Sequence, residues 1–415
     1  MPLLGYGVRL CKQLCSYRFY FITVIIDPHA LQFLGAIRGV IMPLTINAEL
    51  YWQAALFGGL ATFAVAVLLV ATKRWHGAFS LDAACGIQKF HTSPTPRIGG
   101  LALVVGLLVA YFALPASNPN AFQVQILFGL LLVGGAPAFL AGFVEDLTKR
   151  VSVRTRLLAT MASGLLAAVL TGYWINTVNI PGVDWLLALA PVGIVFTAFA
   201  VAGIANSVNI IDGFNGLAGG VVVLMLLTMA AIAYRVDDFV VLNLALFGVL
   251  AVLGFLAVNF PRGYIFLGDA GAYSLGYYVA MLAVALTLRN PSEVSPWAML
   301  LVCGYPIIET LFSVYRRASR KSRRSPGSPD ASHLHSLVYR RIVSRRLMPS
   351  APAWQRNAAT APFMWLYSAV PMLGAIFWPE SLLMVVLWLV FSFMVYQRAY
   401  RKMLSISVYF RLKKA

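Results

Sequence analysis

Three asparagines, one aspartate and four glycines gather between residues 205 and 220, in a short stretch that separates two long apolar runs. Asn206, Asn209 and Asp212 recur every third residue, so on a helical turn their amides and carboxylate share one broad face. Such polar groups cost free energy beside an apolar phase unless they meet partners. We interpret the stretch, with Asn215, as a binding surface. A glycine-rich reversal with solvated polar tips is the simpler alternative.

Two adjacent acids, Glu145 and Asp146, close another apolar run. Neighbouring carboxylates at a helix end repel each other and oppose the negative end of the helix dipole. They suit a site where a divalent cation or a cationic substrate offsets this repulsion. Ion pairs with the following Lys149 and Arg150 are the alternative explanation.

Asp269 lies between Gly268 and Gly271, at the start of a further long apolar run. The beginning of a helix favours an anion, and a hard cation would find accessible carboxylate oxygens there. An N-capping aspartate without a role in chemistry is the alternative.

Basic side chains accompany these acids in two further stretches. Arg97 follows a run of prolines and precedes two glycines, so it can meet a phosphate or a lipid headgroup at the start of a helix. His333 and His335 stand two residues apart in the longest loop, with Arg340 just downstream. Imidazole can bind a metal, and imidazolium can contact phosphate. For the arginines, the alternative explanation is that they only set the orientation of the chain in the membrane.

The composition places all of these groups in an integral membrane protein. Of the 415 residues, 60% are hydrophobic, against roughly 45–50% in globular proteins, and only 11% are charged. The formal net charge of +18 would suit nucleic acid, but the basic residues flank apolar runs, which favours a topological role over nucleic-acid binding. The four cysteines, Cys11, Cys15, Cys85 and Cys303, form no metal-type pair of pairs and indicate no disulfide framework.

Eleven apolar windows are long enough to cross a membrane as helices, so the predicted fold is an all-α, polytopic helical bundle. They make residues 50–397 the transmembrane catalytic domain, followed by a basic cytoplasmic tail at 398–415. Residues 1–49 contain no convincing span, and we predict that 1–41 are a dispensable extension; a deletion to Met42 that lost all activity would refute this. The predicted spans are 50–71, 98–115, 122–143, 156–173, 184–204, 216–234, 238–258, 267–288, 295–315, 361–378 and 380–397.

Lys and Arg residues set the predicted orientation, because cytoplasmic loops are rich in them. If the loop after the first span is cytoplasmic, 26 of these residues lie inside and only Arg235 and Arg289 lie outside, apart from four in the first 49 residues. All the polar stretches above then share the cytoplasmic side. The cytoplasmic loops are predicted at 72–97, 144–155, 205–215, 259–266 and 316–360.

Carboxylates, amides, histidines and arginines on one membrane face suit a reaction between two phosphate-bearing partners, one in the lipid and one in water. Phosphoryl transfer needs positioning and neutralisation of phosphate charge, which Mg²⁺, a few carboxylates and cationic side chains supply. A transporter of a polar solute is the rival from another class. Its functional groups would sit near mid-span, where segments such as 221–231 are almost wholly apolar.

Five motifs follow one another in the chain: Pro-Thr-Pro-Arg-x-Gly-Gly, the paired acids, Asn-x-x-Asn-x-x-Asp-Gly-x-x-Gly, Gly-Asp-x-Gly and His-x-His. Over about residues 90–410 the chain resembles the polyprenyl-phosphate N-acetylhexosamine-1-phosphate transferases of glycosyltransferase family 4, the MraY/WecA type. The resemblance implies transfer of an N-acetylated sugar-1-phosphate from a UDP-N-acetylhexosamine to undecaprenyl phosphate, with release of UMP. It implies an active site on the cytoplasmic face of the bacterial inner membrane, Mg²⁺ with Mn²⁺ as an alternative, and it is compatible with a homodimer.

The motifs of this family also imply roles for individual residues. Asp269 and Asp146 match the metal-binding and catalytic acids, and Glu145 and Asp212 match further catalytic acids. The substrate-binding positions implied are Arg97, Asn206, Asn209, Asn215, His333, His335 and Arg340.

Three positions depart from the family pattern. Glu145 stands where aspartate is usual, Asn215 replaces a second acid of the central motif, and Ser336 replaces a histidine of many members. The absence of a His-His-His run favours the WecA-like branch, which begins lipopolysaccharide or capsule synthesis, over the peptidoglycan phospho-sugar-peptide transferase of the same family.

Overall fold

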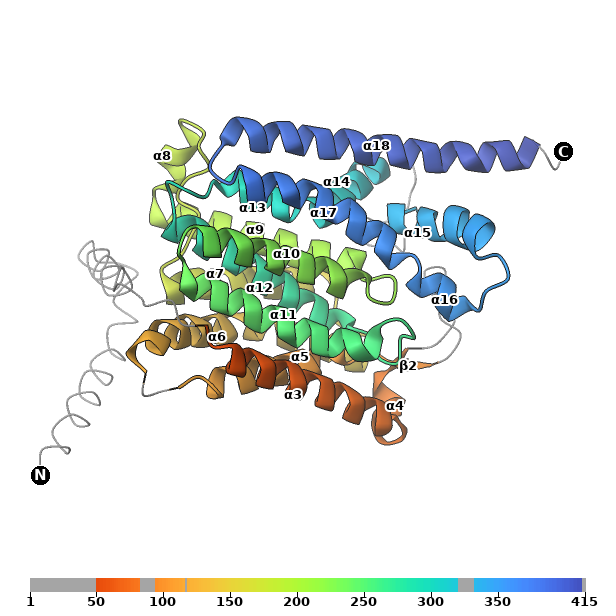
Figure 1. The fold of residues 1–415 in the computed structure, drawn as a ribbon, viewed down its shortest axis with the longest axis horizontal. Coiled ribbons are helices and arrows are strands. Elements are labelled where there is room, and N and C mark those ends of the chain that lie inside the picture. The colour runs from red at the N-terminus through yellow and green to blue at the C-terminus, as the bar shows by residue number, and fades with distance from the viewer. Residues whose placement is uncertain (1–49, 83–93, 116–117, 320–331, 413–415) are drawn as a thin grey trace, which may run out of the picture. The chain divides into compact units, whose positions relative to one another are not determined.

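The computed structural model describes residues 50–82, 94–115, 118–319 and 332–412, so the predicted extension at 1–49 lies outside the described residues. Every predicted span has a helical counterpart (Figure 1). The unbroken helices are α3 (Trp52–Ala71), α5 (Gly99–Phe112), α6 (Pro119–Thr148), α7 (Val153–Thr171), α9 (Ala190–Ile211), α10 (Leu217–Arg235), α11 (Phe239–Asn259), α12 (Gly268–Arg289), α17 (Ala361–Phe377) and α18 (Leu382–Leu412).

The span predicted at 295–315 is broken into α13 (Pro296–Val302) and α14 (Gly304–Ser319), which are bent by 77° at the break. In the part of the chain that the structure describes, nine helices are long and apolar enough to cross a membrane, and the bent pair would make ten. α5 is a shorter apolar helix of 14 residues. The predicted all-α bundle with about eleven membrane helices is thus confirmed.

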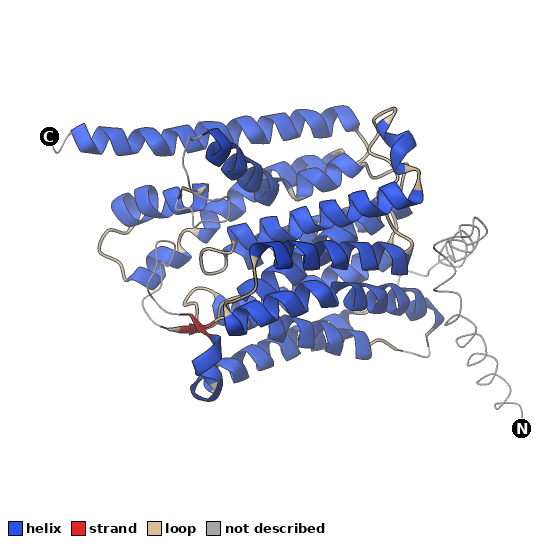
Figure 2. Ribbon diagram, turned by 180° about the vertical axis from the view of Figure 1, so that it is seen from behind, coloured by secondary structure: helices blue, strands red, loops and turns tan. Residues whose placement is uncertain are grey.

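α12 is the central helix of the bundle, and almost all of its side chains are buried. It packs against α5, α6, α7, α9, α10, α11 and α13 (Figures 1 and 2). Gly142 of α6 and Gly100 of α5 face its first turn, where an added Cβ would overlap the backbone of Ala270 or Gly271. Glycine at these two positions therefore lets three helices meet where α12 begins.

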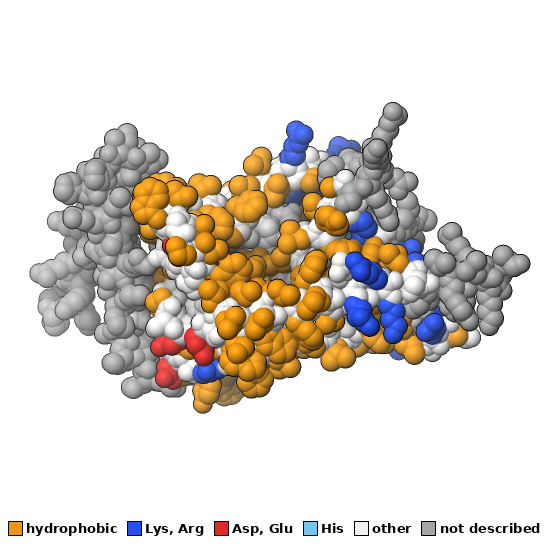
Figure 3. All heavy atoms as spheres, turned by 90° about the horizontal axis from the view of Figure 1, so that it is seen from above, with side chains coloured by type: hydrophobic (Ala, Val, Ile, Leu, Met, Phe, Trp, Pro, Cys, Tyr) orange, Lys and Arg blue, Asp and Glu red, His pale blue; other side chains and the backbone are white. Residues whose placement is uncertain are grey.

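The surface of the bundle is apolar along its middle and basic at one end. α18 exposes Leu383, Leu387, Val390 and Met394 along the half that corresponds to the predicted span. Figure 3 shows apolar side chains over the middle of this face and Lys and Arg side chains towards one end. An apolar belt with a basic border is what a helix bundle in a membrane requires.

Several connections are more ordered than the sequence predicts. α9 continues to Ile211, so the predicted loop 205–215 is helical over its first seven residues. The described part of the predicted loop 316–360 contains three short helices, and the predicted tail at 398–415 continues α18 as far as Leu412. The short helices are α15 (Leu334–Val338), the π-helix η1 (Tyr339–Leu347) and α16 (Ala353–Ala358); α8 (Val183–Leu187) precedes α9.

A small hairpin joins α3 to α5 and carries Arg97. After α4 (Lys73–Ser80), strand β1 (Leu81–Asp82) pairs antiparallel with β2 (Thr95–Pro96). The backbone of β2 and the start of α5 then bonds to the loop before α12: Phe266 N–H donates to Pro96 O at 2.8 Å, and Gly99 N–H donates to Phe266 O at 2.9 Å. These bonds hold Arg97 beside the first turn of α12.

Candidate active site

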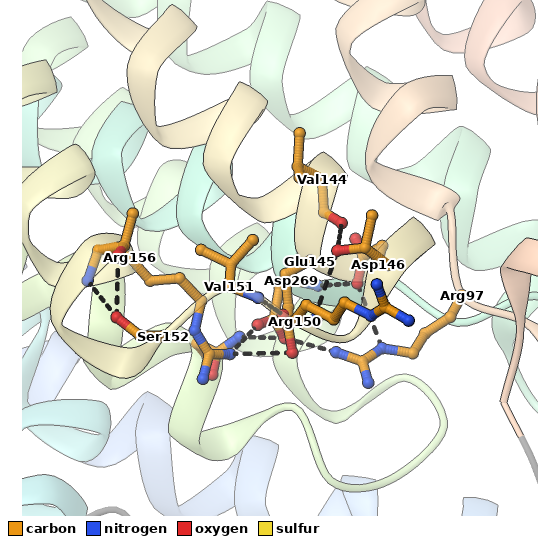
Figure 4. Close-up of polar contacts among 12 residues, drawn as sticks. Arg97, Val144, Glu145, Asp146, Arg150, Val151, Ser152, Arg156 and Asp269 are labelled. Carbon is orange, nitrogen blue, oxygen red and sulfur yellow. Dashed lines mark hydrogen bonds and ion pairs between the residues drawn. The ribbon is translucent and has the colours of Figure 1, made fainter.

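Asp269 lies in the first turn of α12, at the centre of a cluster of charged side chains (Figure 4). Its Oδ1 atom accepts hydrogen bonds from Arg97 Nη2 at 2.7 Å and from Asn209 Nδ2 at 3.1 Å. Its Oδ2 atom is paired with Arg156 Nη1. The residue is only 6% exposed, so its charge depends on these partners rather than on water.

Asp146 holds Asp269 in position through the backbone of α12. Its side chain is fully buried, and its two carboxylate oxygens accept the backbone N–H groups of Asp269 at 2.8 Å and of Ala270 at 2.9 Å. These N–H groups have no partner inside α12, because the first turn of a helix leaves its donors free. Asp146 thus caps α12 from another helix. It also forms an ion pair with Arg97, whose Nε atom lies 3.2 Å from Asp146 Oδ1.

Glu145 holds the turn between α6 and α7. Its Oε2 atom accepts the Val151 N–H at 2.8 Å, and its Oε1 atom lies 3.9 Å from Arg156 Nη1. Ser152 then caps α7 by accepting the Thr155 N–H at 3.1 Å. The acidic pair predicted as one unit therefore has two tasks: one carboxylate caps α12, and the other orders the approach of Arg156.

Gly268 allows the carboxylate of Asp146 to reach α12. Its φ angle is +75°, a left-handed conformation that favours glycine. A Cβ atom at this position would lie 2.5 Å from Asp146 Oδ2, closer than real contacts permit. The first glycine of the Gly-Asp-x-Gly motif is thus explained by the close approach of Asp146 on α6 to the start of α12.

The face predicted for Asn206, Asn209 and Asp212 is split by the structure. Asn209 bonds Asp269, whereas Asn206 Nδ2 donates to Thr160 Oγ1 at 3.1 Å and ties α9 to α7. Asp212 follows the end of α9 and is half-buried, and no described residue donates a hydrogen bond to its carboxylate. Burial, together with the charges of Asp269 and Asp146, raises the pKa of Asp212 to about 7, although Arg97 opposes the change.

Asn215 serves the backbone around the cluster. Its N–H donates to Asn357 Oδ1 at 2.8 Å, and its Nδ2 donates to Pro261 O at 3.0 Å. These bonds connect the turn after α9 to α16 and to the loop before α12. Asn206 and Asn215, both predicted to bind substrate, are thus not brought to Asp269 in the structure.

The two histidines lie on the other side of the turn that contains Asp212. His335 Nε2 faces Gly213, where an added Cβ would be 3.3 Å away, and the ring of Phe214 meets the His335 ring edge-on at 5.6 Å. His333 stacks on His335, with ring centroids 5.2 Å apart. Arg340, further along, donates from Nε to Ser336 O at 3.2 Å and is largely exposed.

Comparisons of the sequence with known proteins identify a family for this chain. Residues 128–287 match the family model described as glycosyl transferase family 4. A probable undecaprenyl-phosphate N-acetylglucosaminyl 1-phosphate transferase of Bacillus subtilis is 28% identical over 260 residues, which are 63% of this chain and 70% of the relative. A phospho-N-acetylmuramoyl-pentapeptide-transferase of Clostridium perfringens is 30% identical over 238 residues, which are 55% of this chain and 70% of the relative. The chain belongs to glycosyl transferase family 4.

The family resemblance drawn from the motifs is therefore confirmed, and the protein is a transferase built into a membrane bundle. A further family-4 relative, the undecaprenyl-phosphate alpha-N-acetylglucosaminyl 1-phosphate transferase of Yersinia pestis, is 26% identical over 306 residues, which are 72% of this chain and 78% of the relative. The segment that matches the family model contains Asp146, Asn209, Asp212 and Asp269.

A divalent cation fits the charge of this family-4 site. Two guanidinium groups, from Arg97 and Arg156, face four carboxylates in the cluster, which leaves a formal excess of two negative charges when all four carboxylates are ionised. Burial lowers the pKa of Arg97, but the charges of Asp269, Asp146, Asp82 and Asp212 together raise it further, so the net direction is upward. Carboxylate and amide oxygens are ligands that Mg²⁺ prefers.

The described residues do not form a finished metal cage. No group of three or more histidine, cysteine or acidic side chains in the described part of the chain is arranged to hold an ion. Asp146 and Asp269 have protein donors on both oxygens, whereas none of the described residues donates to Asp212. Asp212, supported by Asp269 and by the Asn209 amide oxygen, is thus the group in this family-4 site best placed to receive a cation.

Two residues that contact the predicted site residues of this family-4 chain were not singled out in the sequence. Arg156 looks like one of several arginines that set topology, and nothing in its spacing distinguishes it from its neighbours. Glu309 is a fully buried acid on α14 whose Oε1 atom lies 2.9 Å from His333 Nδ1. A lone acid inside a predicted span is a signal that could have identified it.

Proposed function

We propose that this family-4 enzyme transfers an N-acetylated sugar-1-phosphate from a UDP-sugar to undecaprenyl phosphate. In the net reaction, an oxygen of the lipid phosphate bonds to the sugar-bearing phosphorus, the bond from that phosphorus to UMP breaks, and UMP leaves with the electron pair. The supporting observation is the convergence of Asp269, Arg97, Arg156 and Asn209 at one end of an apolar bundle, in a chain whose relatives are named for this chemistry.

The side chains divide the work of this reaction. Arg97 and Arg156 are placed to bind phosphate oxygens, since guanidinium groups match phosphate in geometry and charge. Asp212 and Asp269 would hold Mg²⁺, or Mn²⁺ in its place. When bound, the ion would supply positive charge against the pyrophosphate of the donor and the leaving UMP. Asp146 keeps Asp269 in position, and His335 faces Gly213, in the turn that contains Asp212.

The site would face the cytoplasm of the bacterial inner membrane. Lys73, Arg74, Lys149 and Arg150 surround the end of the bundle that holds Asp269, whereas Arg235 and Arg289 lie at the opposite ends of α10 and α12. Cytoplasmic borders carry such a basic excess. Undecaprenyl phosphate and a water-soluble UDP-N-acetylhexosamine could then both reach the cluster, and the product would begin an O-antigen or capsule-type polysaccharide.

A second candidate function is transfer from a donor whose sugar carries a peptide. It is favoured by the 30% identity to the pentapeptide transferase of Clostridium perfringens. The WecA-like reading remains our proposal because the histidine loop contains His-x-His rather than three consecutive histidines.

The test is an assay of UMP release in detergent, with radiolabelled undecaprenyl phosphate and a panel of UDP-sugars that includes the peptide-bearing donor. We expect turnover with a UDP-N-acetylhexosamine, dependence on Mg²⁺, and no turnover for Asp269→Asn. Glu380→Gln is the matched control, because Glu380 is an exposed acid 3.9 Å from Arg235 at the other end of the bundle. Near-normal turnover of Asp269→Asn, or labelled product from the peptide-bearing donor alone, would contradict the proposal.

A further inference from the structure

α14 presents two polar side chains on one buried face. Tyr305 and Glu309 are four residues apart, so they lie one helical turn above each other, and both are fully buried. The Tyr305 and Tyr367 rings meet at 5.6 Å, edge-on, beside the carboxylate of Glu309. A charged group in such an aromatic environment is costly unless a partner balances it.

Each of these two side chains holds one histidine of the His-x-His pair. Glu309 Oε1 lies 2.9 Å from His333 Nδ1 and also accepts the backbone N–H of Leu334 at 3.1 Å. Tyr305 Oη lies 3.2 Å from His335 Nδ1. Both rings are bound through Nδ1 and stack nearly parallel, at 9°.

The histidine pair adjoins the charged cluster through a single turn. His335 Nε2 faces Gly213, which directly follows Asp212, and Phe214 packs against the His335 ring. α14 thus acts as a template that sets two imidazoles beside Asp212. The contacts run from Tyr305 and Glu309 on α14 to the two histidines, and from His335 to Gly213 beside Asp212.

We infer that Glu309 is the residue that positions His333 and balances its charge when His333 donates to a donor phosphate. This inference rests on the proposed function. A phosphate oxygen at Nε2 needs an Nε2–H while Nδ1–H is already donated to Glu309, so His333 must then be an imidazolium. Among the described residues, the one ion pair of Glu309 is with His333, and a neutral amide could accept the same two N–H groups without a buried charge.

Two substitutions separate charge from geometry. Glu309→Gln keeps an oxygen for His333 Nδ1 and Leu334 N–H but removes the charge, whereas Glu309→Ala removes both. Thr310→Ala is the matched control, because the Thr310 hydroxyl bonds only the backbone oxygen of Pro306, at 2.8 Å, on the same helix. Loss of a carboxylate behind a functional histidine typically lowers activity about 10- to 100-fold.

The first measurement is kcat for UMP release at saturating donor over a range of pH. We expect Glu309→Gln to lose about 10-fold and the alkaline limb of its kcat profile to move to lower pH, because an amide does not balance the charge of a His333 that donates to a bound donor phosphate. Glu309→Ala should lose about 100-fold. An unchanged pH profile for Glu309→Gln would overturn the inference, whether its rate were normal or reduced, since a merely structural role would not move the limb.

The second measurement needs no turnover. Diethyl pyrocarbonate modifies neutral, accessible imidazole, and mass spectrometry reports the rate at His333. We expect slow modification in the wild type and in Thr310→Ala and several-fold faster modification in both Glu309 variants. Equal rates in all four proteins would overturn the inference. If the wild type released no UMP from any UDP-sugar yet the Glu309 variants were modified faster, the proposed function would fail and the positioning of His333 would stand.

Discussion

Asp146→Asn tests whether the second acid of the pair acts by holding α12. The substitution preserves shape, but an asparagine has one acceptor oxygen and an NH₂ group where Asp146 has two acceptors. One of the two N–H groups, of Asp269 or Ala270, therefore loses its partner in a fully buried position.

The expected cost follows from these contacts. A buried donor left without an acceptor costs about 1–3 kcal/mol. Removal of a negative charge from the start of a helix adds about 0.3–1 kcal/mol. Arg97, whose Nε atom is 3.2 Å from the carboxylate, also loses part of its charge balance. The total of about 2–4 kcal/mol predicts a melting temperature several °C lower in detergent.

The assay combines thermal unfolding with UMP release. Because Asp269 would shift with the first turn of α12, we expect turnover to fall on the order of 100-fold. Glu145→Gln is the control, since glutamine still accepts the Val151 N–H and should melt close to the wild type. An Asp146→Asn protein that melted with the wild type while losing turnover would refute the capping role and place Asp146 in the reaction itself.

Three further predictions follow from neighbouring contacts. Arg156→Gln should lower kcat/KM on the order of 100-fold and Arg156→Lys should recover part of it, because only a guanidinium matches phosphate and Asp269 together. Burial raises the pKa of Asp212 to about 7, so the ionisable carboxyl makes the protein less stable as the pH rises from about 4 to about 7; Asp212→Asn without metal should therefore stabilise the protein by at most about 4 kcal/mol at pH 8 and by less at pH 5, measured as a higher melting temperature. Asn206→Ala should cost about 1 kcal/mol of stability with little change in KM, whereas Asn209→Ala should lower turnover; equal kinetics for the two variants would contradict the different partners they have.

The helices could be predicted from the sequence because apolar length alone sets a membrane span. All eleven predicted windows became helices, including the one that is bent at Cys303. The ends were predicted less well. Residues 205–215 were predicted as a cytoplasmic loop with a helical turn, but α9 continues to Ile211, where bonds such as Asn206 to Thr160 satisfy the polar groups inside the bundle.

The convergence of the acids could be predicted, but their division of labour could not. Glu145 and Asp146 are adjacent and chemically alike, so nothing local shows that one caps a helix more than a hundred residues away. That role depends on how α6 packs against α12, which Gly142 and Gly268 permit. The same limit applies to Arg156, whose partner Asp269 is 113 residues distant.

The polarity of three helix ends explains why this cluster needs cations. Asp146 lies in the last turn of α6 and Asp212 directly follows α9, so both sit where free carbonyl groups concentrate negative charge. Asp269 alone lies at a helix start, which favours its charge. Arg97 pairs with Asp146 and Asp269, but the described residues offer Asp212 no ion pair. Of the three aspartates, Asp212 therefore has the charge with the fewest compensating partners. A bound cation would stabilise the protein most if it lay beside Asp212, at the end of α9.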